Sequence, residues 1–282
     1  MVFDIYKYYF MQELKNFINL TRLNKPIGFI LLFWPCSWGL SLAYKEIGEL
    51  NTFIYFLTLF FLGSVLMRSA GCIFNDIVDK DLDKKVKRTR DRPIASGLVS
   101  AKRGLIYVLF LCTLAFLILI QFNEITIILG LCSMLLAFSY PFMKRLTYWP
   151  QLFLGLTFNW GAVMAWTSLT GSISIEIVVL YIAAIFWTLG YDTIYGAQDI
   201  EDDEIIGVKS TSIKFKKNLK LFVMCSYSIS ISLLILIFSK SFGFNLQTLM
   251  ILGFIISLFY QVKIIKITNP STCMRAFKLN GL

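Results

Sequence analysis

Eight long apolar runs constrain this chain more than any other feature of its sequence. A helix of about twenty mostly apolar residues matches the thickness of the hydrocarbon core of a bilayer. Backbone N–H and C=O groups cannot stay unpaired in lipid, so runs of this kind must be helical. The runs cover residues 26–44, 53–74, 104–121, 125–140, 151–169, 173–191, 219–239 and 246–262. We expect an all-α membrane bundle of eight transmembrane helices around a central cavity; a ninth embedded segment near the C-terminus is left open.

Composition supports a membrane protein and excludes several chemistries. The 282 residues are 57% hydrophobic and 16% charged, with a mean hydropathy of +0.70. Such values lie outside the range of soluble domains. There is no histidine, and the six cysteines show no CxxC spacing, so zinc sites of the HExxH kind and a histidine base are excluded. Carboxylates, lysine, arginine and tyrosine remain for any chemistry.

The distribution of basic residues predicts how the chain crosses the membrane. Alternate connections and the two terminal segments hold 24 of the 27 lysines and arginines. By the positive-inside rule, both termini are cytoplasmic in a bacterial inner membrane. The net charge of +10 then reflects topology and contact with anionic lipid, and no nucleic-acid partner is expected. Residues 1–22 have the pattern of an amphipathic interfacial segment of one domain, 1–282, and show no cleavable signal pattern.

Four aspartates and an asparagine lie within nine residues directly after the second apolar run. If the helix continues, Asn75, Asp79 and Asp83 are four residues apart and share one face. Such a stripe of oxygen ligands is half of a site for a hard cation, and magnesium fits best because it also accepts phosphate oxygens. The candidate metal ligands here include Asp76 as well. A solvated loop of mixed charge is the alternative.

A second acidic segment, from Asp192 to Glu204, follows the sixth apolar run. A continuous helix would place Asp192, Asp199 and Asp203 on one face. Eleven of the seventeen Asp and Glu residues lie between Asp76 and Asp91 or between Asp192 and Glu204. Both segments follow runs that cross the membrane in the same direction, so the chain resembles two parallel four-helix halves. We therefore expect the two acidic segments to be cytoplasmic and to face each other across a central cavity.

Basic residues accompany both acidic segments. Arg68 lies inside the second run, and an arginine at such depth normally faces the bundle interior or a wet cavity. Six further cations lie between Lys84 and Arg92. Metal ligands beside cations suit a multiply charged anion such as a diphosphate, although topology alone accounts for some of these charges. The candidate anion-binding residues are Arg22, Arg68, Arg88, Arg92, Lys144, Arg145 and Lys209.

These motifs resemble the UbiA family of intramembrane aromatic prenyltransferases. The resemblance extends over nearly the whole chain, except that the last seventy residues add little. One departure is Ala95, where the family pattern RPLPSG has proline. The motifs are RLNKPIG at 22–28, LLFWP at 31–35, NDxxDxxxD at 75–83, KRTRDRPIASG at 87–97, YPFMKR at 140–145 and YDTIYGAQDIEDDEIIGVKS at 191–210.

The resemblance implies a reaction and roles for these residues. It implies transfer of a polyprenyl group from polyprenyl diphosphate to 4-hydroxybenzoate, ortho to the hydroxyl, in ubiquinone biosynthesis and with Mg²⁺. Asn75, Asp79 and Asp83 would serve one metal group, and Asp199 and Asp203 the other; Asp192 joins the catalytic candidates. The YPxxKR motif favours Arg145 as the partner of the benzoate carboxylate. Anchoring the helix or contacting the diphosphate are alternative roles for Arg145, and Arg22 or Lys25 would then be the next candidates.

Other classes fit less well. A divalent-cation transporter would place its carboxylates near the bilayer midplane, not beside many cations at one surface. A CDP-alcohol phosphatidyltransferase would carry one compact D/G-rich motif, and a lipid-binding structural protein would not need the carboxylates. Prenyltransferases directed to menaquinone or haem remain alternatives within the family. Prenyl chain length and oligomeric state are not determined by the sequence.

The topology can be tested by cysteine labelling in intact cells. Single cysteines near residues 46, 123, 172 and 242 should react with a membrane-impermeant reagent added outside, because those connections are expected to be extracytoplasmic. Cysteines near residues 84 and 209 should react only after the membrane is permeabilised. Labelling of position 84 from outside would contradict the eight-span topology.

Overall fold

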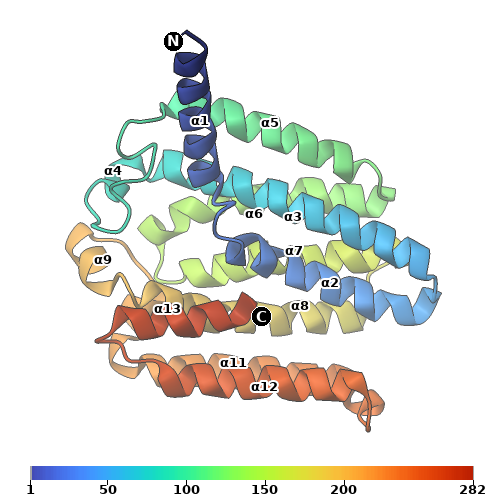
Figure 1. Ribbon diagram of the computed structural model, residues 1–282. Coiled ribbons are helices and arrows are strands. Elements are labelled where there is room, and N and C mark those ends of the chain that lie inside the picture. Colours follow the sequence, from blue (N-terminus) through green and yellow to red (C-terminus); the bar gives the residue numbers. More distant parts are fainter. Residues whose placement is uncertain (1, 282) are drawn as a thin grey trace.

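The structure is a computed structural model that describes residues 2–281, and within this range it consists of helices and connecting turns (Figure 1). Eight helices are long and apolar enough to cross a membrane, as the sequence predicts. They are α2 (Ile27–Ile47), α3 (Leu50–Val78), α5 (Ala101–Leu119), α6 (Glu124–Leu146), α7 (Pro150–Thr170), α8 (Ile175–Gly196), α11 (Leu219–Phe238) and α12 (Leu246–Ile264).

Shorter helices occupy the ends of the bundle. They are α1 (Val2–Thr21), α4 (Lys80–Asp83), α9 (Ile200–Ile206), α10 (Thr211–Lys214) and α13 (Pro270–Lys278), with single 3₁₀ turns at Lys216–Asn218, Ser239–Ser241 and Leu279–Gly281. The segment near the C-terminus left open by the sequence is α13, which has nine residues. Its nine residues rise about 14 Å, less than half of the thickness of a hydrocarbon core.

The spans form a bundle with α7 and α8 at its centre. α7 packs against α2, α6 and α8. On one side α3 packs against both α2 and α5; on the other side α11 packs against α8, and α12 packs against α11 and α13. Gly39 of α2 permits the closest of these contacts, because a Cβ there would lie 2.2 Å from the carbonyl oxygen of Ala162 in α7. Close approach through small residues is the usual way for helices to pack in lipid, where burial of apolar surface gives no advantage.

Hydrogen bonds between buried polar side chains fix the register of these helices. The amide of Asn159 in α7 donates to the Thr188 hydroxyl of α8 at 2.8 Å, and the hydroxyls of Thr126 in α6 and Thr167 in α7 lie 3.0 Å apart. A polar group buried without a partner is costly, so pairs of this kind favour one packing arrangement over others.

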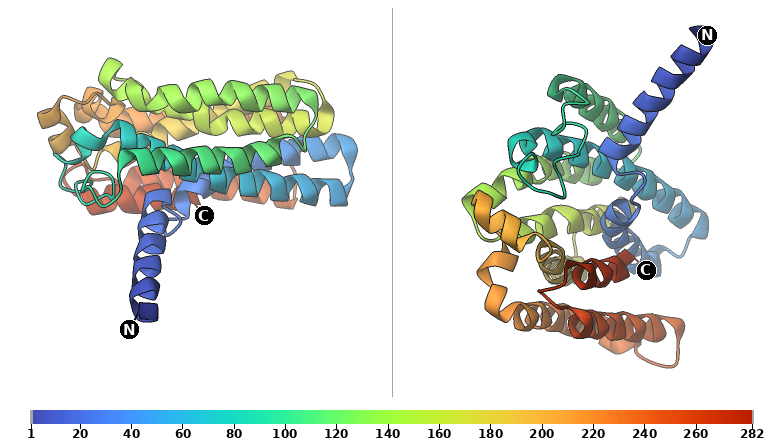
Figure 2. Two further views of the ribbon diagram at one scale, coloured as in Figure 1. Left: turned by 90° about the horizontal axis from the view of Figure 1, so that it is seen from above. Right: turned by 60° about the vertical axis from the view of Figure 1, so that its left-hand side comes forward.

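Both acidic segments lie at one end of the bundle. Figure 1 shows α4 and α9 together at the left, while the connections α2–α3, α5–α6 and α11–α12 lie at the right. The helix α1 projects away from the bundle, roughly perpendicular to the spans and closer to the end that carries the acidic segments (Figure 2). Its side chains Tyr6, Tyr8 and Phe10 are 73%, 69% and 67% exposed. Exposed aromatic rings on a helix perpendicular to the spans fit the interfacial position expected for this segment.

The C-terminal helix is tied to the bundle by a buried hydrogen-bond network. Trp187 of α8 donates its indole N–H to the side-chain oxygen of Asn280 at 2.8 Å, and Asn280 donates to Gln261 of α12 at 3.0 Å. Gln261 in turn accepts from the hydroxyl of Tyr227 in α11 at 2.7 Å. These four side chains are almost fully buried. The network therefore holds together α8, α11, α12 and the 3₁₀ turn that follows α13.

We predict that Asn280→Ala destabilises the protein, because it leaves the indole N–H of Trp187 without its partner. The expected cost is about 1–3 kcal/mol, the usual penalty for a buried unsatisfied polar group. Thermal unfolding of the detergent-purified protein would measure it. Asn218→Ala is the matched control, since Asn218 is exposed and caps no helix through its side chain. Equal melting temperatures for the two variants would contradict this role of the network.

Candidate active site

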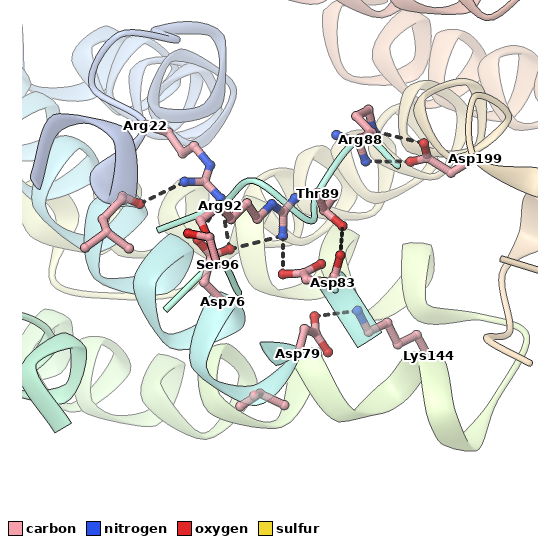
Figure 3. Close-up of polar contacts among 12 residues, drawn as sticks. Arg22, Asp76, Asp79, Asp83, Arg88, Thr89, Arg92, Ser96, Lys144 and Asp199 are labelled. Carbon is pink, nitrogen blue, oxygen red and sulfur yellow. Dashed lines mark hydrogen bonds and ion pairs between the residues drawn. The ribbon is translucent and has the colours of Figure 1, made fainter. Parts of the chain in front are cut away.

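The two acidic segments lie on the wall of one cavity of about 1500 Å³, as the sequence predicts. The cavity is lined near one end of the bundle by almost all of the candidate site residues. These are Arg22, Arg68, Asn75, Asp76, Asp79, Asp83, Arg88, Arg92, Lys144, Asp192, Asp199, Asp203 and Lys209. Among the candidates only Arg145 is not part of this wall. Figure 3 shows how several of these side chains meet.

The first acidic segment is not one unbroken helix. α3 ends at Val78, and Asp79 has φ −95° and ψ 6°, outside the helical region, before α4 begins at Lys80. The backbone N–H groups of Asp79 and Asp83 still donate to carbonyls four residues earlier. The spacing expected for a continuous helix is therefore nearly kept, and Asn75, Asp79 and Asp83 all reach the cavity.

Arginines and a lysine pair with the carboxylates of this segment (Figure 3). Asp76 is 1% exposed and accepts from Arg22 at 2.7 Å and from Arg92 at 3.1 Å. Arg92 also donates to Asp83 at 2.8 Å, and Lys144 pairs with Asp79. Charge-assisted pairs of this kind are needed because isolated buried carboxylates are strongly disfavoured. They also join the end of α1, α3, the 84–100 loop and α6.

Arg22 holds an unusual backbone conformation at this junction. Its φ of 59° makes it the one non-glycine residue with positive φ in the described chain. This left-handed conformation is unfavourable for residues with a Cβ, and non-glycine examples often occur at functional sites. It ends α1 and directs the guanidinium onto Asp76.

The second acidic segment is also interrupted, which corrects the expectation of one continuous face. α8 ends at Gly196, and α9 starts at Ile200 after a turn in which Asp199 has φ −113° and ψ 9°. Even so, Asp192, Asp199 and Asp203 all line the cavity. The turn changes the direction of the Asp199 side chain. The three carboxylates therefore reach the cavity from α8, from α9 and from the turn between these helices.

Arg88 links the two acidic segments. Its guanidinium donates to both carboxylate oxygens of Asp199, with Nε at 2.9 Å from Oδ1, and to the hydroxyl of Tyr195 at 3.1 Å. It also lies over the Tyr195 ring, 5.5 Å from the ring centroid. A bidentate arginine–carboxylate pair is among the strongest side-chain contacts. The 84–100 loop is thereby fastened to the start of α9.

Two carboxyl groups outside the spans keep their protons to higher pH than usual. Burial, together with the nearby charge of Asp199, raises the pKa of Asp203 to about 6. Burial also raises the pKa of Asp79, against the opposing effect of Lys144. Desolvation disfavours the charged form of a carboxyl, and a cation bound nearby would restore it.

The remaining candidate cations lie in different settings. Lys209 donates to the Leu146 carbonyl at 3.3 Å. Arg145 donates to the Val78 carbonyl at 2.7 Å and to Asp79 at 3.4 Å, and it lines a separate small hollow beside Gly207. The Val78 carbonyl thus holds the guanidinium of Arg145 behind the cavity wall.

Beyond the charged end, the cavity becomes a long apolar arm. Its wall includes Phe60 of α3, Leu119 of α5, Met164 of α7 and Phe122, which lies at the opposite end of the bundle. Fifteen residues of α3 separate Phe60 from Asn75, a rise of about 22 Å. α5 and α6 contact each other little, and wall residues on both helices are also exposed, so the arm reaches the outer surface there.

Some wall residues were not predicted from the sequence. Phe277 and Lys278 of α13 line the charged end, and the Phe277 ring packs 4.6 Å from that of Tyr195. The sequence of the C-terminal tail contains no motif that indicates a binding or catalytic role. The tail reaches the cavity only because the chain folds back and packs against α8. An amphipathic pattern in residues 270–278 was the available signal, and such a pattern does not reveal what the helix covers.

The donor set fits a hard divalent cation such as Mg²⁺. Carboxylate oxygens from both segments and the amide of Asn75 line one cavity, and oxygen is the ligand that magnesium prefers. In the arrangement described for residues 2–281, no three acidic or cysteine side chains converge closely enough to hold a metal ion. Most of these carboxylates are instead paired with cations, so metal binding would require them to exchange partners.

The chain belongs to the UbiA prenyltransferase family, whose pattern it matches over residues 32–282. A curated relative, the 4-hydroxybenzoate octaprenyltransferase of Vibrio atlanticus (strain LGP32), is 39% identical over 275 residues, which are 95% of this chain and 93% of that protein. The mitochondrial 4-hydroxybenzoate polyprenyltransferase of Arabidopsis thaliana is 48% identical over 84% of this chain. The chain spans only 58% of that protein's length.

Solved structures show the same fold. A UbiA homologue from Aeropyrum pernix K1 in its apo form superposes with a TM-score of 0.75 at 23% identity, covering 90% of this chain and 92% of that one. A UbiA homologue from Archaeoglobus fulgidus, solved with GPP and Mg²⁺, has a TM-score of 0.68 at 15% identity over 94% of this chain and 98% of that one. At these identities the likeness concerns the fold.

Proposed function

We propose that this protein transfers a polyprenyl group from polyprenyl diphosphate to the ring of 4-hydroxybenzoate, ortho to the hydroxyl, in ubiquinone biosynthesis. The observation that carries the proposal is the single cavity, which joins a dense cluster of carboxylates and cations to a long apolar arm. The names of the Vibrio and Arabidopsis relatives support the acceptor and the polyprenyl donor.

The charged end is suited to a diphosphate. Magnesium held by Asn75, Asp79 and Asp83 on one side, and by Asp199 and Asp203 on the other, would neutralise the charge of the bound diphosphate. The Archaeoglobus homologue, which was solved with both GPP and Mg²⁺, supports this assignment. The cations Arg22, Arg88, Arg92, Lys144 and Lys209 would orient the phosphates and stabilise negative charge as the leaving group departs.

The reaction follows from this placement. The bond between the first prenyl carbon and the diphosphate oxygen breaks, and the electron pair leaves with the diphosphate. The resulting allylic cation is captured by the electron-rich ring, and the ring then loses a proton. An apolar arm lined by residues such as Phe60 and Met164 keeps water from the cation.

The proposed setting is a bacterial inner membrane, with residues 1–282 as one domain. The acidic segments would face the cytoplasm, where polyprenyl diphosphate and the aromatic acid meet, and α1 would lie in the cytoplasmic interface. The full-length relationship to the Vibrio protein supports this placement. The labelling experiment described above tests it.

The function is tested with detergent-purified protein, radiolabelled 4-hydroxybenzoate, octaprenyl diphosphate and Mg²⁺, with and without a chelator. We expect Asp79→Asn and Asp199→Asn each to lower turnover about a hundredfold or more, since each removes part of a charge-stabilising centre. Asp81→Asn is the matched control, because the side chain of Asp81 is 90% exposed and pairs only with Lys84.

Chelator should abolish turnover, and added Mg²⁺ should restore it. Near-normal rates for either Asp79→Asn or Asp199→Asn would contradict the two-sided metal site. Product formed from 1,4-dihydroxy-2-naphthoate but not from 4-hydroxybenzoate would contradict the proposed acceptor.

A further variant tests the apolar arm. Gly63 of α3 lines the cavity, and a Cβ there would meet no atom within 4 Å, so Gly63→Trp should fold and block the arm. We expect turnover with octaprenyl diphosphate to fall much more than turnover with geranyl diphosphate, because the short geranyl chain ends before it reaches residue 63. The control is Leu62→Trp at a neighbouring side chain that is 46% exposed and lies off the cavity wall. Equal losses with both donors would argue against the arm as the prenyl channel.

A further inference from the structure

Arg145 contacts a carboxylate of the site from behind the cavity wall. Its side chain comes from the last turn of α6, is 44% exposed and is absent from the main cavity. The Nη2 atom donates to the Val78 carbonyl at 2.7 Å and to Oδ1 of Asp79 at 3.4 Å. Asp79 itself is 1% exposed. Arg145 therefore reaches a buried carboxylate from the outer surface of the bundle.

The two oxygens of the Asp79 carboxylate have different partners. Oδ2 pairs with Lys144, which lines the main cavity (Figure 3), whereas Oδ1 pairs with Arg145. Arg145 lines a separate hollow beside Gly207. A diphosphate bound in the main cavity would therefore compete with Asp79 for Lys144, but not for Arg145. Oδ2 is thus the oxygen that can be released to a metal ion while Oδ1 keeps its partner.

The contact with Val78 supports the break at the end of α3. The last carbonyl groups of a helix have no partner inside the helix, and a cation near them is favoured by the helix dipole. α3 ends at Val78, and Asp79 then leaves the helical region with a ψ of 6°. The guanidinium of Arg145 satisfies the Val78 carbonyl at this point. The same group therefore holds both the backbone before Asp79 and the carboxylate of Asp79.

The last turn of α6 also holds the chain that follows the second acidic segment. The backbone N–H of Lys209 donates to the Lys144 carbonyl at 2.8 Å, and Nζ of Lys209 donates to the Leu146 carbonyl at 3.3 Å. Lys209 follows Asp203 closely in the chain. The end of α6 is thus joined to the first acidic segment through Arg145 and to the region of the second through Lys209.

We propose that Arg145 is a positioning residue that holds Oδ1 of Asp79 and so directs Oδ2 toward the bound divalent cation. The inference rests on the proposed function. Carboxylates that bind metals are usually held by further hydrogen bonds, and loss of such a partner typically lowers metal affinity about 10- to 100-fold. Arg145 then acts through Asp79 and not by contact with a substrate. This role differs from the one that the YPxxKR motif favours, in which Arg145 pairs with the benzoate carboxylate.

The central variant is Arg145→Gln, and its main readout does not depend on turnover. Binding of Mn²⁺ to the detergent-purified protein is measured by equilibrium dialysis, with inorganic diphosphate present on both sides of the membrane. We expect the Kd for Mn²⁺ to rise at least about tenfold, because Oδ1 of Asp79 loses its partner. Arg90→Gln is the matched control and should keep the wild-type Kd, since Arg90 is exposed and lies off the cavity wall.

Steady-state kinetics separate this role from contact with a substrate. In Arg145→Gln, the Mg²⁺ concentration that gives half-maximal turnover should rise with the Kd for Mn²⁺. KM for 4-hydroxybenzoate should stay unchanged, and so should KM for the prenyl diphosphate at saturating Mg²⁺. Arg145→Lys should raise the Kd for Mn²⁺ by a smaller factor, because lysine keeps the charge but lacks the planar set of donors. Melting temperatures of the purified variants check folding.

Each other outcome contradicts the inference. A wild-type Kd for Mn²⁺ in folded Arg145→Gln would overturn it, and if that variant does not fold, a wild-type Kd in Arg145→Lys would do the same. A raised KM for 4-hydroxybenzoate, but not for 4-hydroxybenzamide, would assign Arg145 to the benzoate carboxylate. A raised KM for the prenyl diphosphate at saturating Mg²⁺ would assign it to the diphosphate. A wild-type protein that binds no Mn²⁺ would refute the metal site of the proposed function, and the inference with it.

Discussion

Charge pairing in a medium of low polarity is the constraint on which this structure depends. The carboxylates of Asp76, Asp79 and Asp83 are nearly inaccessible to solvent, and each is paired with a basic side chain. Removing one partner of such a pair is far more costly than the net value of the pair, because it leaves a buried charge without compensation. The pairs therefore determine which elements can meet at this end of the bundle.

The same pairs connect assembly with the proposed reaction. Arg22 comes from the end of α1, Arg88 and Arg92 from the loop after α4, and Lys144 from α6. Each of these cations holds a carboxylate that we assign to a metal or to catalysis. A diphosphate that binds together with Mg²⁺ supplies a new partner for each member of such a pair: Mg²⁺ for the carboxylate and the diphosphate for the basic side chain. The partners can therefore be exchanged without leaving a buried charge unpaired.

The membrane architecture could be predicted closely from the sequence, because the apolar runs must match the bilayer and their helices cannot end inside it. The sequence also indicates that Asp79 and Asp199 face one cavity. It did not reveal that helices break at these two residues, since turns such as 197–199 depend on packing and on the pair with Arg88. It also could not reveal that Arg145 donates to the Val78 carbonyl and to Asp79, because a motif locates a residue but not the contacts of its side chain.

The position of α13 has a consequence for biogenesis. Phe277 and Lys278 complete the charged wall, and Asn280 anchors this segment to the indole of Trp187 in α8. During synthesis, α8 enters the membrane long before residue 280 leaves the ribosome. A nascent chain that already carries both acidic segments thus lacks part of its cavity wall until the end of α13 folds back, so the site cannot be complete before the spans are in place.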